Sequence, residues 1–105
     1  MANTFDGRVA LVTGGNSGIG RATALAFARA GAKVVIAARR RAEGEETVEM
    51  IHAAGGDACF VQTDVSQAEQ VATMVQHALA VYGRLDVACN NAGVSHLLHG
   101  LLTRL

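Results

Sequence analysis

The sequence predicts an α/β fold in which helices cover an open, doubly wound parallel sheet. Short apolar segments alternate with longer segments of helical periodicity, and glycines separate most of them. Strands that alternate with helices in this way are typical of parallel sheets with right-handed crossovers. No proline interrupts the 105 residues, which are about the length of one domain. We therefore expect a single sheet with strand order 3-2-1-4.

The first half of the chain is expected to contain two strands and two helices. The apolar segment 8–13 predicts a strand, and the alanine-rich segment 19–30 predicts a helix that ends at Gly31. Segment 33–38 is apolar and β-branched, as expected of a strand buried on both faces. Segment 41–54 has helical periodicity and ends at a pair of glycines.

The second half is expected to add two strands and one long helix. Segment 58–62 predicts the third strand, and segment 85–89 the fourth. The spacing of Ser66 and Glu69 is that of a capping box, which would open a helix running to about Tyr82. The apolar stripe of this helix consists of Val71, Met74, Val75, Ala78 and Leu79.

A glycine-rich loop, T-G-G-N-S-G-I-G at residues 13–20, joins the first strand to the first helix. Glycine lets the backbone turn sharply and approach a ligand where a Cβ would block it. The helix that follows directs unpaired N–H groups and its positive dipole end to the same place, which suits a pyrophosphate. The alternative is a glycine-rich turn without a ligand. The glycines with this expected role are Gly14, Gly18 and Gly20.

Two motifs in this order resemble those of the short-chain dehydrogenases/reductases. The nucleotide loop of that family, T-G-x-x-x-G-I-G, matches residues 13–20 at every fixed position. A second family motif, N-N-A-G, stands at residues 90–93, and a softer Asp-Val pair stands at residues 64–65. The resemblance covers residues 8–95 and implies a Rossmann-type fold that binds a nicotinamide dinucleotide. The loop residues implied as contacts are Gly14, Asn16, Ser17, Gly18, Ile19 and Gly20.

The resemblance also implies contacts outside the glycine loop. Asp64 would meet the adenine amine and Val65 the adenine face, although Asp64 also suits a purely structural place before a helix. Asn90 and Thr13 are interpreted as structural. The segment implied near the ribose and phosphates is Asn91, Ala92 and Gly93, which would only hold the sheet if no ligand binds.

The end of the second strand bears on the choice of cofactor. Ala38 stands where NAD-dependent members of the family carry Asp, and Arg39 follows it. A guanidinium can hold a 2′-phosphate through paired, charge-assisted hydrogen bonds. We therefore expect NADP(H) in preference to NAD(H), with Arg39 as the main contact and Arg40 as a second. Ser17 stands where many NADP-dependent members are basic, and the alternative is that residues 39–41 are a solvated helix start.

The catalytic pair of the family is missing. The resemblance implies a tyrosine four residues before a lysine whose charge lowers the pKa of the phenol. The only lysine, Lys33, has Arg29 at that spacing, and the only tyrosine, Tyr82, has Asp86. Ser95 follows the N-N-A-G motif too closely to be the catalytic serine. No catalytic residue is assigned, and Tyr82 is interpreted as the packed end of a helix.

These observations predict the cofactor-binding half of an oxidoreductase. Residues 1–95 would form the dinucleotide-binding half-domain and residues 96–105 an irregular tail, in which His96 and His99 lack further metal ligands. Hydride transfer with a carbonyl or alcohol substrate is expected only in a longer parent chain, and the 105 residues alone would be catalytically incomplete. The alternative is a non-catalytic nucleotide-binding or subunit-pairing module.

Composition restricts the partners. Nine basic and nine acidic residues balance to a formal net charge of zero, which gives no support for binding nucleic acid or an anionic membrane. The apolar segments are too short to span a bilayer, and the first residues lack the pattern of a signal peptide. Cys59 and Cys89 would lie at opposite edges of the sheet, as free thiols in a reducing compartment. A cytoplasmic location is expected, and a homo-oligomer is one open alternative.

Overall fold

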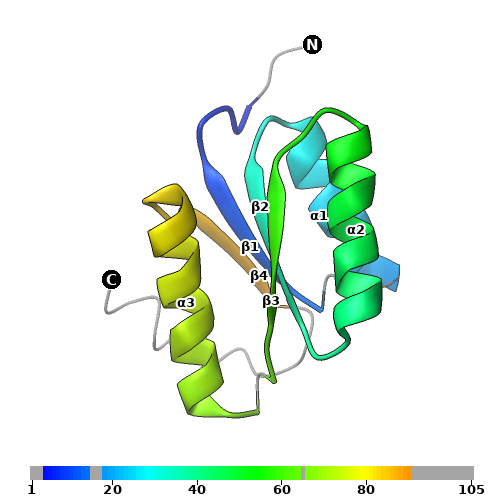
Figure 1. Ribbon diagram of the computed structural model, residues 1–105. Coiled ribbons are helices and arrows are strands. Elements are labelled where there is room, and N and C mark those ends of the chain that lie inside the picture. Colours follow the sequence, from blue (N-terminus) through cyan, green and yellow to red (C-terminus); the bar gives the residue numbers. More distant parts are fainter. Residues whose placement is uncertain (1–3, 15–17, 65, 91–105) are drawn as a thin grey trace.

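The computed structural model describes residues 4–14, 18–64 and 66–90 (Figure 1). Its four strands form one parallel sheet in the order β3-β2-β1-β4, which confirms the predicted fold and strand order. The elements in chain order are β1 (Val9–Thr13), α1 (Gly18–Arg29), β2 (Lys33–Ala38), α2 (Arg41–Ala53), β3 (Ala58–Gln62), α3 (Ala68–Tyr82) and β4 (Val87–Asn90).

Helices cover both faces of the sheet, with α3 on one side and α1 and α2 on the other (Figure 1). Successive side chains of a strand point to opposite faces, so the central strands β1 and β2 supply both cores. On the α3 side the buried residues are Val9, Leu11, Val35, Ala37, Val71, Met74, Val75 and Ala78. On the α1 and α2 side they are Val12, Ala24, Val34, Ile36, Ile51 and Ala58.

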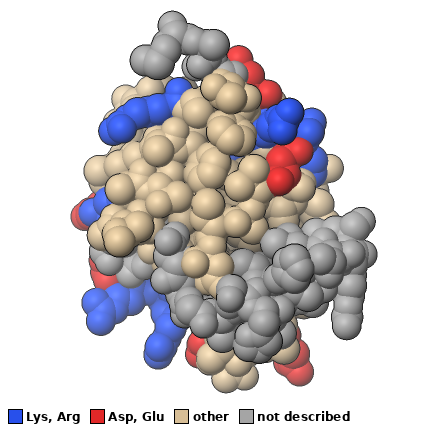
Figure 2. Space-filling model, turned by 180° about the vertical axis from the view of Figure 1, so that it is seen from behind, with Lys and Arg blue, Asp and Glu red and all other residues tan. Residues whose placement is uncertain are grey.

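The two outer strands are less buried than the central pair. Only Ala58 of β3 is fully buried, and the four residues of β4 are all half-buried. The side of the molecule turned away in Figure 1 carries β4, and its described surface is largely uncharged in the middle, with charged side chains at the margins (Figure 2). Among the described residues, no helix is long and apolar enough to span a bilayer.

The helix ends follow the predicted glycines. Gly31 has φ 97°, and its N–H donates to the carbonyl of Ala28 at 3.0 Å, while Ala32 N–H donates to the carbonyl of Phe27 at 3.0 Å. This pair of bonds is the Schellman motif, in which a left-handed residue, most often glycine, satisfies the last carbonyls of a helix. The predicted end of the first helix is therefore confirmed to within one residue.

The capping box predicted for α3 is wrong. The helix begins at Ala68, and its N-cap residue, Gln67, makes no side-chain cap hydrogen bond. The Ser66 hydroxyl donates instead to Oδ1 of Asp64 at 2.6 Å. Ser66 therefore lies one residue before the N-cap position, and its side chain bonds to Asp64 instead of to the first turn of α3.

The fourth strand begins two residues later than predicted. Asp86 precedes β4, and its carboxylate accepts the N–H of Val9 at 2.9 Å, which places Val87 opposite Ala10. At the other end Thr13 lies opposite both Ala37 and Asn90. Because parallel strands end at the same edge, the carboxyl ends of β1, β2 and β4 lie at one side of the sheet.

Candidate functional site

Gly14 and Gly18, on either side of the glycine loop, have backbone conformations that favour glycine, as the motif requires. Gly14 follows β1 with φ 70°, and its N–H donates to the carbonyl of Ala37 at 2.8 Å. Gly18 opens α1 with φ 57°, and a Cβ placed there would meet open space rather than protein. Both positions lie in the left-handed region that favours glycine. Gly14 therefore lies at the carboxyl edge, next to the end of β2.

The first turn of α1 exposes an apolar side chain beside the loop. Ile19 is 78% exposed, although most large apolar side chains here are buried, and Gly20 is buried against the protein. An exposed isoleucine next to a glycine loop offers an apolar contact to a flat ligand.

Several residues of the predicted site or tail lie outside the described residues, namely Asn16, Ser17, Val65, Asn91, Ala92, Gly93, His96 and His99.

The three arginines after β2 have different surroundings. Arg40 forms an ion pair with Glu43 at 3.4 Å, and Arg41 forms one with Glu45 at 3.0 Å. These pairs along α2 agree with the alternative of a solvated helix start for two of the three arginines. Arg39 is exposed and forms no salt bridge within the part of the chain that the structure describes. Its guanidinium is therefore the one best placed to pair with an added anion.

A shallow pocket of about 290 Å³ connects Arg39 to the end of β3. Gln62 donates from its side chain to the carbonyl of Arg39 at 3.0 Å, which links the ends of β2 and β3. The walls of the pocket are polar. Its lining residues are Arg39, Gln62, Thr63, Asp64 and Gln70.

Hydrogen bonds to nearby residues in the chain hold Asp64 in place. Its Oδ1 accepts the Ser66 hydroxyl at 2.6 Å and the Ser66 N–H at 3.0 Å, and its own N–H donates to Oε1 of Gln70 at 2.7 Å. The Ser66 hydroxyl and then the Ser66 N–H lower the pKa of the Asp64 carboxyl, with a smaller contribution from the charge of Arg39. The group is therefore ionised at neutral pH and could accept a hydrogen bond from an amine, while the same bonds also serve the structural interpretation.

The first and fourth strands are joined by side chains at the carboxyl edge. Thr13 is fully buried, and its hydroxyl lies 3.0 Å from Oδ1 of Asn90 and 3.3 Å from the carbonyl of Cys89. These contacts support the structural interpretation of Thr13 and Asn90. They fix where β4 ends, which is where the rest of the N-N-A-G motif follows.

Tyr82 lies near the amino ends of the strands, opposite the carboxyl edge. Its hydroxyl donates to Oδ1 of Asp57 at 3.2 Å, and Lys33, the first residue of β2, has its Nζ 5.6 Å from the centre of the phenol ring. Burial, and then the neighbouring Cys59 and Asp57, raise the pKa of Tyr82 well above its ordinary value. Family catalysis needs a lowered pKa, so this environment favours a packed tyrosine rather than a proton donor.

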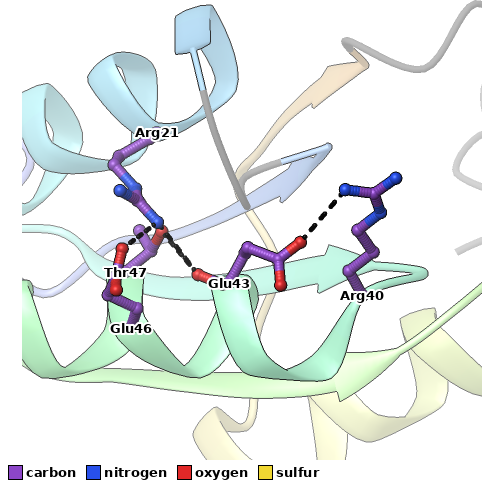
Figure 3. Close-up of polar contacts among 5 residues, drawn as sticks. All are labelled: Arg21, Arg40, Glu43, Glu46 and Thr47. Carbon is purple, nitrogen blue, oxygen red and sulfur yellow. Dashed lines mark hydrogen bonds and ion pairs between the residues drawn. The ribbon is translucent and has the colours of Figure 1, made fainter.

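The contacts of Arg21, near the glycine loop, were not predicted from the sequence. Arg21, in the first turn of α1, donates from Nε to the Thr47 hydroxyl at 2.9 Å and pairs through Nη2 with Glu46 at 2.8 Å (Figure 3). A cation is unfavourable near the positive end of a helix dipole, so an arginine there indicates a specific partner. That signal does not reveal which residue is the partner.

A family model described as short chain dehydrogenase matches residues 8–101. The chain belongs to this family. A curated relative, the short chain dehydrogenase/reductase astE of Aspergillus oryzae, is 47% identical over 92 residues, which are 87% of this chain and 35% of the relative. The short-chain dehydrogenase/reductase homolog YusS of Bacillus subtilis is 44% identical over 89 residues, or 84% of this chain and 82% of that protein.

Solved short-chain dehydrogenases share the fold. A metagenomic short-chain oxidoreductase in complex with NADP has a TM-score of 0.82 and 41% identity over 87% of this chain and 41% of its own. A short chain dehydrogenase/reductase from Burkholderia phymatum in complex with NAD has a TM-score of 0.78 and 39% identity over 81% of this chain and 30% of its own. Relatives with either nicotinamide cofactor are therefore similar to this chain.

Proposed function

We propose that this chain binds a nicotinamide dinucleotide across the carboxyl edge of its sheet and prefers NADP(H) to NAD(H). The observation that carries the preference is Arg39, an exposed guanidinium without a salt bridge among the described residues, at the end of β2. The side chain before it, Ala38, is small, buried and uncharged, so position 38 itself carries no carboxylate that would repel a 2′-phosphate.

The proposed pose uses the arrangement of the strand ends. The pyrophosphate would lie at the start of α1, where Gly14 and Gly18 allow close approach, and Ile19 would offer an apolar contact. The adenosine end would lie toward β2 and β3, with its 2′-phosphate on Arg39 and its amine near Asp64. The contacts that we expect from Asn16, Ser17, Val65, Asn91, Ala92 and Gly93 are part of this proposal.

For a longer polypeptide that contains this segment, we propose hydride transfer between NADP(H) and a carbonyl or alcohol. The 105 residues are proposed to lack this turnover, because their one tyrosine lies at the edge away from the cofactor and has a raised pKa. The same observation favours a second candidate function, a nucleotide-binding module without its own chemistry.

Free thiols at Cys59 and Cys89, on the two outer strands, support a reducing compartment such as the cytoplasm.

The test is a pair of titrations of the purified chain with NADPH and NADH. We expect tighter binding of NADPH, and Arg39→Gln should weaken it about tenfold or more while leaving NADH binding nearly unchanged. Arg41→Gln is the matched control, since it removes the same charge from an arginine that is paired with Glu45. Equal losses for both cofactors, or an equal loss in the control, would count against the proposed preference. Addition of a carbonyl substrate should produce no oxidation of NADPH by the chain alone.

A further inference from the structure

The second arginine after β2 is held by a carboxylate. Arg40 is the N-cap residue of α2, and its Nη1 lies 3.4 Å from Oε2 of Glu43, one turn along the helix. In Figure 3 the guanidinium of Arg40 points back toward this carboxylate. The position of Glu43 therefore decides how much of the charge of Arg40 is offered to a ligand.

The turn that carries Glu43 is anchored to α1. The carbonyl of Glu43 accepts Nη2 of Arg21 at 3.1 Å and lies 3.3 Å from the hydroxyl of Thr47, a fully buried residue. The side chain of Arg21 is 24% exposed, whereas that of Arg40 is 77% exposed. The anchor is thus the better shielded part of the network and the Arg40–Glu43 pair the weaker part. Figure 3 shows the two parts meeting at Glu43.

A phosphate added near Arg39 would experience both charges of the exposed pair. The carboxylate of Glu43 would compete with the phosphate for Arg40, and as a like charge it would also repel the phosphate. An uncharged 2′-hydroxyl experiences neither effect. Glu43 should therefore act on NADP(H) and leave NAD(H) almost unaffected.

We propose that Glu43 is a specificity-determining residue that weakens the preference for NADP(H) by holding Arg40, so that recognition of the 2′-phosphate rests mainly on Arg39. This inference depends on the proposed cofactor site at the end of β2. Arg21 and Thr47 are positioning residues in this scheme, because they keep the first turn of α2 where Glu43 can reach Arg40.

The test compares Glu43→Gln with Glu45→Gln in the full chain, by titration with NADPH and with NADH. Both substitutions remove one negative charge from α2, but Glu45 pairs with Arg41 instead of Arg40. Glu43→Gln should tighten NADPH binding about threefold to fivefold, the upper part of the range of an exposed ion pair, and leave NADH binding unchanged. Glu45→Gln should change neither.

A double variant identifies the residue through which Glu43 acts. In Glu43→Gln/Arg40→Gln the gain should disappear, since the arginine released by the first substitution is no longer present. Arg40→Gln alone should weaken NADPH binding less than Arg39→Gln does. The adenosine fragments 2′,5′-ADP and 5′-AMP should reproduce the contrast between the two dinucleotides, because the effect is confined to the 2′ position.

The outcomes separate this inference from the proposed function. If the wild type prefers NADPH but Glu43→Gln gives no gain, or the gain also appears in Glu45→Gln or survives the loss of Arg40, the role of Glu43 is overturned alone. If the wild type binds neither dinucleotide, or binds both equally and Arg39→Gln changes nothing, the proposed cofactor preference and the inference built on it are both overturned.

Discussion

Val9 and Asp86 bond each other twice, although 77 positions separate them in the chain. The N–H of Val9 donates to Oδ2 of Asp86 at 2.9 Å, and the N–H of Asp86 donates to the carbonyl of Val9 at 2.9 Å. Arg84 holds the carboxylate from the other side, with contacts at 2.8 and 2.7 Å. This junction lies just before β4 and at the start of β1, so it helps to set the alignment of the two strands.

The first prediction concerns the charge of Asp86. The side chain of Arg84, and then the N–H of Val9, lower the pKa of this carboxyl, so its stabilising effect is complete above the unfolded-state pKa of about 3.9. The effect is lost as the pH falls through the lower pKa of the folded state. Asp86→Asn should therefore lower the urea midpoint at neutral pH, and the difference from wild type should vanish in acid.

The measurement is urea unfolding of both proteins from neutral pH down to about pH 2, so that the series passes below the unfolded-state pKa and toward the folded one. Arg84→Gln is the companion variant, since it removes the same ion pair from the other side and leaves the bond to Val9. A difference between wild type and Asp86→Asn that stays constant over this range would show that the charge of Asp86 has no role.

The second prediction concerns the buried hydroxyl at the carboxyl edge. Thr13→Val keeps the shape of the side chain but leaves Oδ1 of Asn90 without the donor that Thr13 supplies at 3.0 Å. The expected loss of unfolding free energy is about 0.5–1.5 kcal/mol, the net contribution of one hydrogen bond. Thr13→Ser keeps the hydroxyl and loses one methyl group, worth about 0.8 kcal/mol. Chemical denaturation measures both variants, and a Val variant as stable as wild type would contradict the role of this bond.

The third prediction sets helix propensity against packing at Gly44. Alanine is favoured over glycine within a helix by about 1 kcal/mol. A Cβ at Gly44 would, however, collide with the ring of Phe60, which packs from β3 against α2. Overpacking of this kind costs about 1–3 kcal/mol, so Gly44→Ala should be destabilising on balance.

A second variant tests whether Phe60 is the cause. Phe60→Leu removes the ring, so Gly44→Ala should be less harmful in that background than in the wild type. Thermal or urea unfolding of the four proteins gives the coupling between the two positions. If Gly44→Ala stabilises the wild-type chain, the packing argument is wrong.

The fourth prediction uses the single tyrosine. The chain has one tyrosine and no tryptophan, so the near-ultraviolet absorbance of phenolate reports Tyr82 alone. Its pKa is raised in the folded state, which means that its contribution to stability is present below the unfolded-state pKa of about 10 and is lost as the pH rises toward the folded value. We expect Tyr82 to titrate near pH 10 in urea and distinctly later in the native protein.

Asp57→Asn is the variant that checks the cause of that shift. It removes a carboxylate that accepts the hydroxyl of Tyr82, so the native titration should move toward lower pH without reaching the urea value, because burial remains the larger cause. Native and urea titrations that coincide would indicate that Tyr82 is solvated, and the environment described for it would then be wrong.

Local patterns in the sequence were enough for the order of the elements and for most of their ends. Gly31 ends α1 as predicted, because a left-handed glycine satisfies its last carbonyls with neighbours in the chain. The strand order follows from the alternation of strands and helices together with the constant hand of the crossovers, and it is confirmed. The three arginines after β2 were also predicted correctly to follow the second strand, because that prediction needs only their positions in the sequence.

The sequence by itself therefore determined the family and the sheet, and the edge at which we propose that a cofactor binds was also inferred from it. Tertiary structure decided that Asp86 bonds Val9 just before β4, that Tyr82 packs near Lys33 at the amino ends of the strands, and that Arg21 holds the turn of Glu43. Each of these depends on a partner distant in the chain, and periodicity and capping signals describe only neighbours within a few residues. Such partners become definite only when packing brings the elements together, because hydrogen bonds and ion pairs act over a few ångströms of space.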